Sequence, residues 1–250
     1  MENATNLELR NFFIEYLEKT MSYAKNHPEY DINKNNYHLH SDNAKLALTI
    51  LNFTTKLKDL IFDLKKTQVF IQRFPNKKFY EENEIDQLAY IKYHYEVFLH
   101  KIHTILEIKK LAVNEFYKIG LDEKDCSWKN LKNQPKLKNK PVSTIIEFYF
   151  KSFEHIIKHR NLNTHRAFFG DKKNEELSFD YSIYKNAEKY GYDVGEDFRR
   201  IIPKTFLNYL IKDYRKEKID YIKNGTQIAE NYIEQFETII LTEFFIKVKK

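Results

Sequence analysis

Glycine and proline are scarce in this chain, and their scarcity limits the possible folds more than any other feature. Five glycines and five prolines occur in 250 residues, against average contents near 7% and 5%. Sandwiches of β-sheets and doubly wound α/β folds need many tight turns, which these residues normally provide. The sequence therefore predicts an all-α protein.

Composition excludes several classes of site and protein. The single cysteine, Cys126, rules out a disulfide framework, a cysteine-based zinc site and an iron–sulfur cluster, and the glycines form no phosphate loop or dinucleotide fingerprint. Short apolar runs and a charged N-terminal pattern predict no membrane segment and no signal peptide, so we expect a cytoplasmic protein without a cofactor. The net charge of +6 is compatible with a nucleic-acid partner.

Hydrophobic periodicity predicts six long helices. Their approximate ranges are Asn6–Asn26, Asp42–Arg73, Asn83–Tyr117, Ser143–Ala167, Pro203–Lys223 and Thr226–Lys247. A basic loop over about 122–141 and a less regular segment ending near Asp197 lie between helices. We interpret residues 1–250 as one all-α domain: a bundle of long antiparallel helices with an additional helical region at about 197–248.

The strongest local signal lies in the helix predicted at about 143–168. Three histidines, three basic residues and two asparagines follow Glu154 within twelve residues. The cluster that we consider consists of Glu154, Lys158, His159, Arg160, Asn161, His165 and Arg166. Arginine binds phosphate oxygens in bidentate fashion, and a histidine with a pKa near neutrality can transfer a proton. The pattern therefore favours chemistry on an anion.

Arg160-Asn161 followed by three residues and His165 resembles the Arg-x4–6-His signature of the HEPN superfamily, in which a polar residue often follows the arginine. The resemblance implies a helical bundle that cleaves single-stranded RNA without a metal. His165 would be the general acid or base, Arg160 would stabilise phosphate charge, and Asn161 would orient the pair. It also implies a toxin or phage-defence effector, with an antitoxin or defence-system partner.

Helix geometry bears on how these residues act together. At about 100° per residue, Arg160 and His165 point about 140° apart on an ideal helix. HEPN nucleases form homodimers in which two motifs face one cleft, and the angular offset is compatible with this arrangement. Glu154, Lys158 and His165 fall within about 40° of one another, so Glu154 and Lys158 could orient His165.

Two further groups of residues remain open. The basic loop carries Trp128, Lys129, Lys132 and Lys136, which could stack on and steer RNA. A second group forms one stripe of potential metal ligands on the third predicted helix: Glu96, His100, His103 and Glu107. The alternatives to a nuclease are therefore a catalytically inactive HEPN-like module that binds nucleic acid or protein, and a metal-binding helical bundle.

Overall fold

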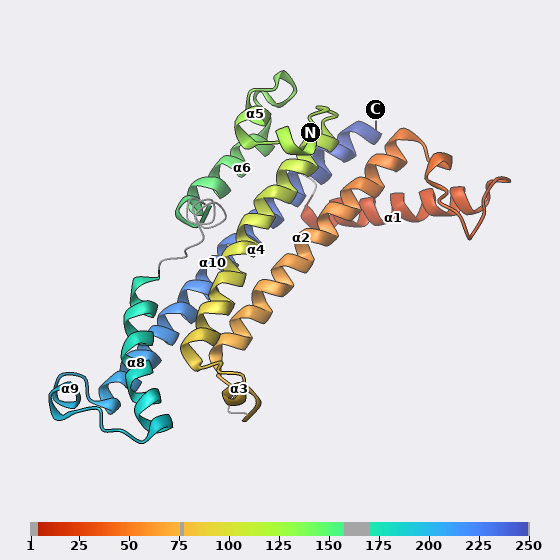
Figure 1. The fold of residues 1–250 in the computed structure, drawn as a ribbon. Helices are drawn as coiled ribbons and strands as arrows, with labels where there is room; N and C mark the ends of the chain where they lie inside the picture. Colours follow the sequence, from red (N-terminus) through yellow and green to blue (C-terminus); the bar gives the residue numbers. More distant parts are fainter. Residues whose placement is uncertain (1–4, 76–77, 158–170, 250) are drawn as a thin grey trace. The chain divides into compact units, whose positions relative to one another are not determined.

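The computed structural model describes residues 5–75, 78–157 and 171–249, and the regular elements among them are helical (Figure 1). The α-helices are α1 (Asn6–Lys25), α2 (Asp42–Gln72), α3 (Lys78–Glu82), α4 (Gln87–Phe116), α5 (Trp128–Lys132), α6 (Pro141–Ser152), α8 (Lys172–Tyr190), α9 (Glu196–Ile201) and α10 (Lys204–Val248). Short 3-10 turns occupy Tyr37–Leu39, Glu123–Asp125 and Pro135–Leu137. The prediction of an all-α fold is confirmed.

The chain divides into two compact units, each assembled from separate stretches of sequence. Unit 1 contains residues 1–60, 104–153 and 229–250, and unit 2 contains residues 61–103 and 154–228. The long helices α2, α4 and α10 each contribute one part to each unit. Whether the two units form the predicted single domain stays a prediction.

In unit 1, a buried carboxylate and an aromatic pair join α1 and α2 to α10. Glu237 of α10 is bonded by Arg10 of α1 at 2.8 Å and by Lys58 of α2 at 3.3 Å. Such a buried carboxylate is tolerated because cations surround it. Phe13 and Phe244 pack edge to face with their ring centroids 5.5 Å apart, an arrangement that aromatic quadrupoles favour.

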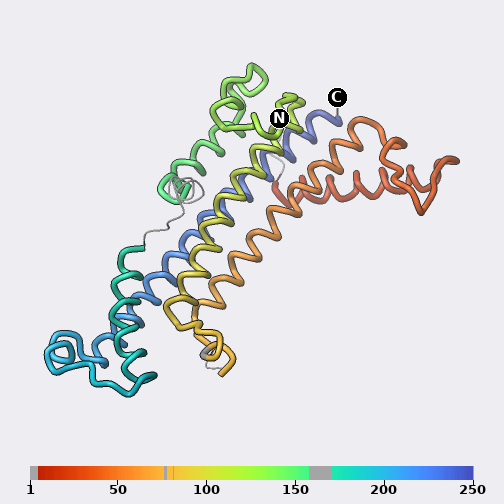
Figure 2. Tube along the Cα trace, in the orientation of Figure 1, coloured from red at the N-terminus to blue at the C-terminus, as the bar shows by residue number. Residues whose placement is uncertain are grey.

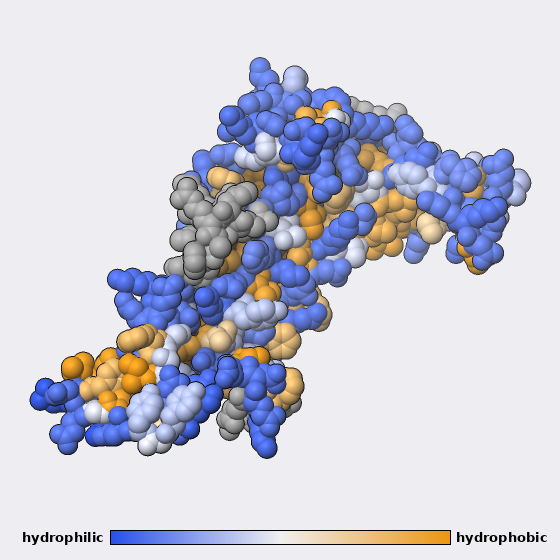
Figure 3. Space-filling model, viewed as in Figure 1, coloured by the Kyte–Doolittle hydropathy of each residue, from blue (hydrophilic) through white to orange (hydrophobic). Residues whose placement is uncertain are grey.

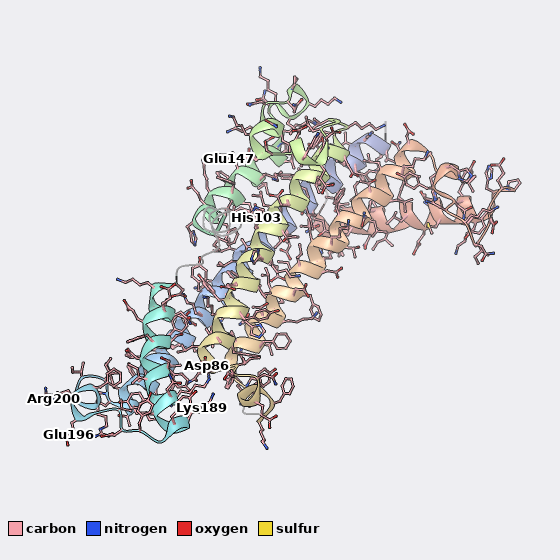
Figure 4. All side chains as sticks on the ribbon, in the orientation of Figure 1. Asp86, His103, Glu147, Lys189, Glu196 and Arg200 are labelled. Carbon is pink, nitrogen blue, oxygen red and sulfur yellow. The ribbon has the colours of Figure 1, made fainter. Side chains whose placement is uncertain are left out.

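In unit 2, α2 and α4 are antiparallel, as the sequence predicts. Asp63 accepts a hydrogen bond from Lys101 at 2.6 Å, whereas Phe70, further along α2, contacts His94, which lies earlier in α4. The predicted start of α4 at Asn83 is wrong, because the Asp86 carboxylate accepts hydrogen bonds from the first backbone N–H groups and begins the helix there (Figure 4).

Unit 2 also pairs α4 with α10, and these two helices run parallel. Arg215 of α10 donates to Gln87 of α4 at 3.0 Å. About two turns later in both helices, the rings of Tyr221 and Tyr95 pack edge to face. Parallel neighbours need a long connection between them, and here residues 117–203 provide it. The bundle is therefore not antiparallel throughout.

The segment before α9 is a regular helix, contrary to the prediction of a less regular one. α8 begins where Asp171 caps it and ends where Gly191 adopts a left-handed conformation (φ 71°). α8 lies beside the first part of α10 and antiparallel to it (Figure 2): Lys173 bonds to Glu217, and the Tyr184 hydroxyl donates to the Ile202 carbonyl at 2.6 Å. Few apolar residues mark this helix, so its caps and neighbours define it.

The predicted break between two C-terminal helices is also wrong. α10 continues through Asn224 and Gly225 without interruption. A Cβ atom at Gly225 would lie 2.6 Å from the Phe98 ring, so the absence of a side chain lets the α4 ring approach the α10 backbone. Gly225 thus serves close packing within unit 2 rather than a helix end.

The helix predicted to start at Ser143 begins two residues earlier. Lys140 occupies the N-cap and Pro141 the first helical position, where proline costs nothing because that N–H has no partner inside a helix. α6 then ends before Phe153, which takes a turn conformation, and residues 154–157 resume the helix. The continuation of the predicted helix beyond residue 157 lies outside the described residues.

Candidate functional site

The predicted catalytic cluster falls mainly in residues 158–170, outside the part of the chain that the structure describes. The predicted site residues there are Arg160, His165, Asn161, Lys158, His159 and Arg166. Glu154 is described, and it is half-buried on the helical stretch 154–157. On that stretch Ile156 and Ile157 are buried, so one side of it packs into a core, as the sequence predicts.

His155 is exposed, and one hydroxyl group, that of Tyr221, attaches it to α10. Its Nε2 atom hydrogen-bonds the Tyr221 hydroxyl, and their rings also pack edge to face. Burial raises the pKa of both Tyr95 and Tyr221, and the neighbouring Tyr221 hydroxyl raises the pKa of Tyr95 further. The Tyr221 hydroxyl thus links His155 to α10, and the Tyr221 ring packs edge to face against Tyr95 of α4 with the centroids 5.6 Å apart.

Asp171, immediately after the predicted cluster, is the centre of a buried polar network. Its carboxylate accepts hydrogen bonds from the Tyr214 hydroxyl at 2.7 Å, the Lys218 ammonium at 2.9 Å and the backbone N–H of Asn174 at 3.1 Å. Burial raises the pKa of Asp171, but these donors outweigh burial and hold the pKa below its ordinary value. Asp171 is therefore an anion at neutral pH.

Lys218 is buried together with its carboxylate partner. The exposed fractions of the Lys218 and Asp171 side chains are 11% and 8%. The Lys218 ammonium also lies 4.3 Å from the centre of the Tyr95 ring and 5.0 Å from that of Tyr214. Rings that face a cation in this way partly replace the water that it loses on burial.

The predicted RNA-binding loop has a defined structure, and Trp128 is not exposed on it. The indole is 9% exposed, and its Nε1–H donates to Glu147 of α6 at 2.7 Å (Figure 4). Trp128 therefore stabilises unit 1 and offers no open ring face on which a base could stack. Lys129 and Lys132 are exposed, and hydrophilic residues cover the surface around α5 (Figure 3).

A groove of about 530 Å³ in unit 1 includes one of the predicted RNA-binding residues, Lys136. Its basic side chains also include Lys118, Lys140 and Lys247. Three of these lysines have partners in the fold: Lys136 donates to the Lys118 carbonyl at the end of α4, Lys118 pairs with Asp42 at 3.5 Å, and Lys140 pairs with Glu243 at 3.0 Å. Their positions are thus explained by contacts within unit 1.

The stripe of potential metal ligands on α4 does not assemble into a metal site. His103 is buried in the middle of α4 (Figure 4), whereas Glu107 pairs with Lys110 at 2.7 Å. The described ranges contain no group of three or more His, Cys, Asp or Glu residues placed to hold a metal ion. In the same ranges no helix is both long and apolar enough to cross a membrane.

A family model described as HEPN_Cthe2314-like HEPN matches residues 50–240, which is about three quarters of the chain. The chain belongs to the HEPN family. No curated protein and no solved structure matches it. The match extends well beyond 143–168, where the sequence resembles HEPN proteins most closely, and it includes α4, α8 and most of α10.

Three residues of this HEPN chain were not predicted as site residues, although they bond the residues on either side of the motif. Tyr214, Lys218 and Tyr221 are spaced at i, i+4 and i+7, which places them on one face of a helix. This spacing was a usable signal within a predicted helix. That Asp171 and His155 are their partners depends on contacts across 43 to 66 residues of sequence, which no local pattern contains.

Proposed function

We propose that this HEPN chain is a metal-independent endoribonuclease that acts as a toxin or phage-defence effector. The observation that carries the proposal is the Arg160-Asn161-x3-His165 motif inside the matched range 50–240. A HEPN chain that retains both the cation and the imidazole keeps the two groups that RNA cleavage requires. An antitoxin or another defence protein is proposed as its partner.

The proposed reaction is an internal transesterification. His165 accepts the proton of a ribose 2′-OH, and this oxygen attacks the adjacent phosphorus. The bond from phosphorus to the 5′ oxygen breaks, and that oxygen takes up the proton that His165 has accepted, leaving a 2′,3′-cyclic phosphate and a 5′-OH end. Arg160 binds the non-bridging oxygens, whose negative charge increases in the transition state. No metal takes part in these steps.

The neighbouring residues have supporting roles in this proposal. Asn161 orients the pair or the substrate, and Glu154 with Lys158 orients His165. His159 and Arg166 add donors for the RNA backbone. The exposed Lys129 and Lys132, together with Lys136, attract the phosphates of RNA.

Incubation of single-stranded RNA with the protein in EDTA tests the proposal. We expect cyclic-phosphate ends from the unmodified protein, and a loss of rate of about 100- to 10,000-fold in Arg160→Ala and in His165→Ala. His38→Ala and Arg200→Ala are matched controls, because both side chains are exposed and neither belongs to the cluster. Figure 4 labels Arg200.

Two results would contradict the proposal. Cleavage by all variants alike would place the site elsewhere. Absence of cleavage, with folded protein that still binds RNA and binds it equally well after His165→Ala, would support the inactive binding module instead.

A further inference from the structure

Two described residues that flank the segment 158–170 both bond to α10. His155 lies three residues before this segment, and Asp171 follows it directly. The two residues and their partners on α10 all belong to unit 2. The sequence that carries the proposed catalytic pair is therefore attached to one helix on both of its sides.

The partners on α10 share one face of that helix. Tyr214, Lys218 and Tyr221 lie within about 60° of arc on an ideal helix. Tyr214 and Tyr221 are seven residues apart, which corresponds to about 10 Å along the axis. We call these three residues the clamp face.

The attachment after the segment is buried and charged. Asp171 receives both the Tyr214 hydroxyl and the Lys218 ammonium, and it caps α8 at the same time. Because hydrogen bonds between ionised groups are strong and directional, this attachment fixes where α8 begins. It thereby fixes the position of Asp171 within unit 2.

The attachment before the segment is a single hydroxyl that is also in contact with α4. The Tyr221 hydroxyl is hydrogen-bonded to the Nε2 atom of His155, and it also bonds the Tyr95 hydroxyl. The Tyr221 ring is held by edge-to-face contacts with Tyr95 and with Phe98, at centroid distances of 5.6 and 5.9 Å. A hydroxyl supported in this way can hold His155 in one orientation.

We propose that the clamp face positions the Arg160–His165 pair for RNA cleavage, with Tyr221 as the principal positioning residue and Lys218 as the second. This inference rests on the proposed nuclease function. The clamp residues do not touch the RNA. They lower the freedom of the segment's ends, so that the catalytic side chains spend more time in the reactive geometry.

A double-mutant cycle between Tyr221 and His155 tests the clamp. Tyr221→Phe removes one hydroxyl and keeps the ring packing, whereas His155→Leu removes the imidazole that this hydroxyl bonds. We expect each variant to lower kcat about 10- to 100-fold with KM changed less than about twofold. The double variant should be no slower than either single one, since both remove the same bond.

Two further variants separate positioning from general damage. His155→Gln keeps a side chain that can hydrogen-bond the Tyr221 hydroxyl as donor or acceptor, and it should recover most of the rate lost in His155→Leu. Tyr209→Phe is the matched control, because Tyr209 is also on α10 but is 62% exposed, and it should leave kcat unchanged.

Hydrogen exchange tests the clamp without relying on catalysis. In Tyr221→Phe and in Lys218→Met, amide exchange within residues 158–170 should be faster than in the unmodified protein and in Tyr209→Phe. The same variants can be measured in a chain that also carries His165→Ala, because exchange does not require catalysis. The measurement therefore distinguishes failure of the clamp from failure of the nuclease proposal.

Three outcomes would overturn the inference: kcat in Tyr221→Phe equal to that in Tyr209→Phe, multiplicative losses in the double variant, or unchanged exchange in residues 158–170. A fall in kcat that His155→Gln does not recover would also count against it, since the hydrogen bond to Tyr221 would then not be what matters.

Discussion

At the scale of single residues, Lys109 is the most unusual side chain in unit 1. It is fully buried, and its ammonium nitrogen lies 4.1 Å from the centre of the Tyr149 ring, with Tyr232 and Phe236 within 6 Å. Within the described residues this nitrogen has no hydrogen-bond partner. Burial lowers the pKa of Lys109 well below its usual value. The protein therefore buries an amine without a hydrogen bond, and the three rings only partly replace the water that it has lost.

Replacing this amine with a thioether should stabilise the protein. Lys109→Met keeps the length of the side chain and removes a buried polar group without a hydrogen bond, a group that costs about 1–3 kcal/mol. We expect a gain of that size in the free energy of unfolding, measured by urea titration at pH 7. A loss of stability would mean that the amine makes a necessary interaction.

The gain should depend on pH with a definite sign. A folded pKa below the unfolded value near 10.4 means that the unfolded chain binds more protons between those two pH values. Stability of the unmodified protein therefore rises with pH in that window. The advantage of Lys109→Met should shrink between pH 7 and pH 9.5, as a second titration can check.

At the scale of secondary-structure elements, α10 shows how a contact can reverse a helix propensity. Glycine in a helix interior is less favourable than alanine by about 1 kcal/mol. At Gly225, however, an added methyl group would lie 2.6 Å from the Phe98 ring, and this ring is fully buried. The element therefore depends on a close approach that only glycine permits.

Gly225→Ala should destabilise the protein in spite of the better propensity. We expect a loss of about 1–3 kcal/mol from overpacking, measured by thermal or urea unfolding. Asn224→Ala, at the exposed neighbouring position, should be neutral or slightly stabilising. Phe98→Leu in the Gly225→Ala background should recover part of the loss, and no recovery would contradict this account.

At the scale of the whole molecule, the offset of about 140° between Arg160 and His165 on an ideal helix is compatible with a site built from two copies, which stays a prediction. We expect light scattering to give a mass about twice the 30.4 kDa of one chain. In a symmetric dimer, each cleft residue occurs twice, so one copy can supply the arginine and the other the histidine.

Mixing two inactive variants tests this arrangement. After subunit exchange between Arg160→Ala and His165→Ala proteins, about half of the dimers are mixed, and each mixed dimer retains one of two complete pairs. The mixture should therefore recover roughly a quarter of the unmodified activity. No recovery, with exchange verified, would indicate that each copy uses its own pair.

The sequence by itself determined the helical class, the limits of α1 and α2 to within one residue, and a motif that the family match includes. These features depend on neighbours within one or two turns of the chain. Apolar spacing, the Thr5–Glu8 capping box and the scarcity of glycine and proline all act at that range.

Only the tertiary structure decided the features that depend on distant partners. Trp128 belongs to the core because Glu147 receives its N–H, α8 is regular because Asp171 meets Tyr214 and Lys218, and α10 continues through Gly225. Each of these outcomes is set by contacts that form when separate helices pack. The free energy of such contacts exceeds the free-energy differences in local helix propensity. Local sequence patterns also do not encode which partners will meet.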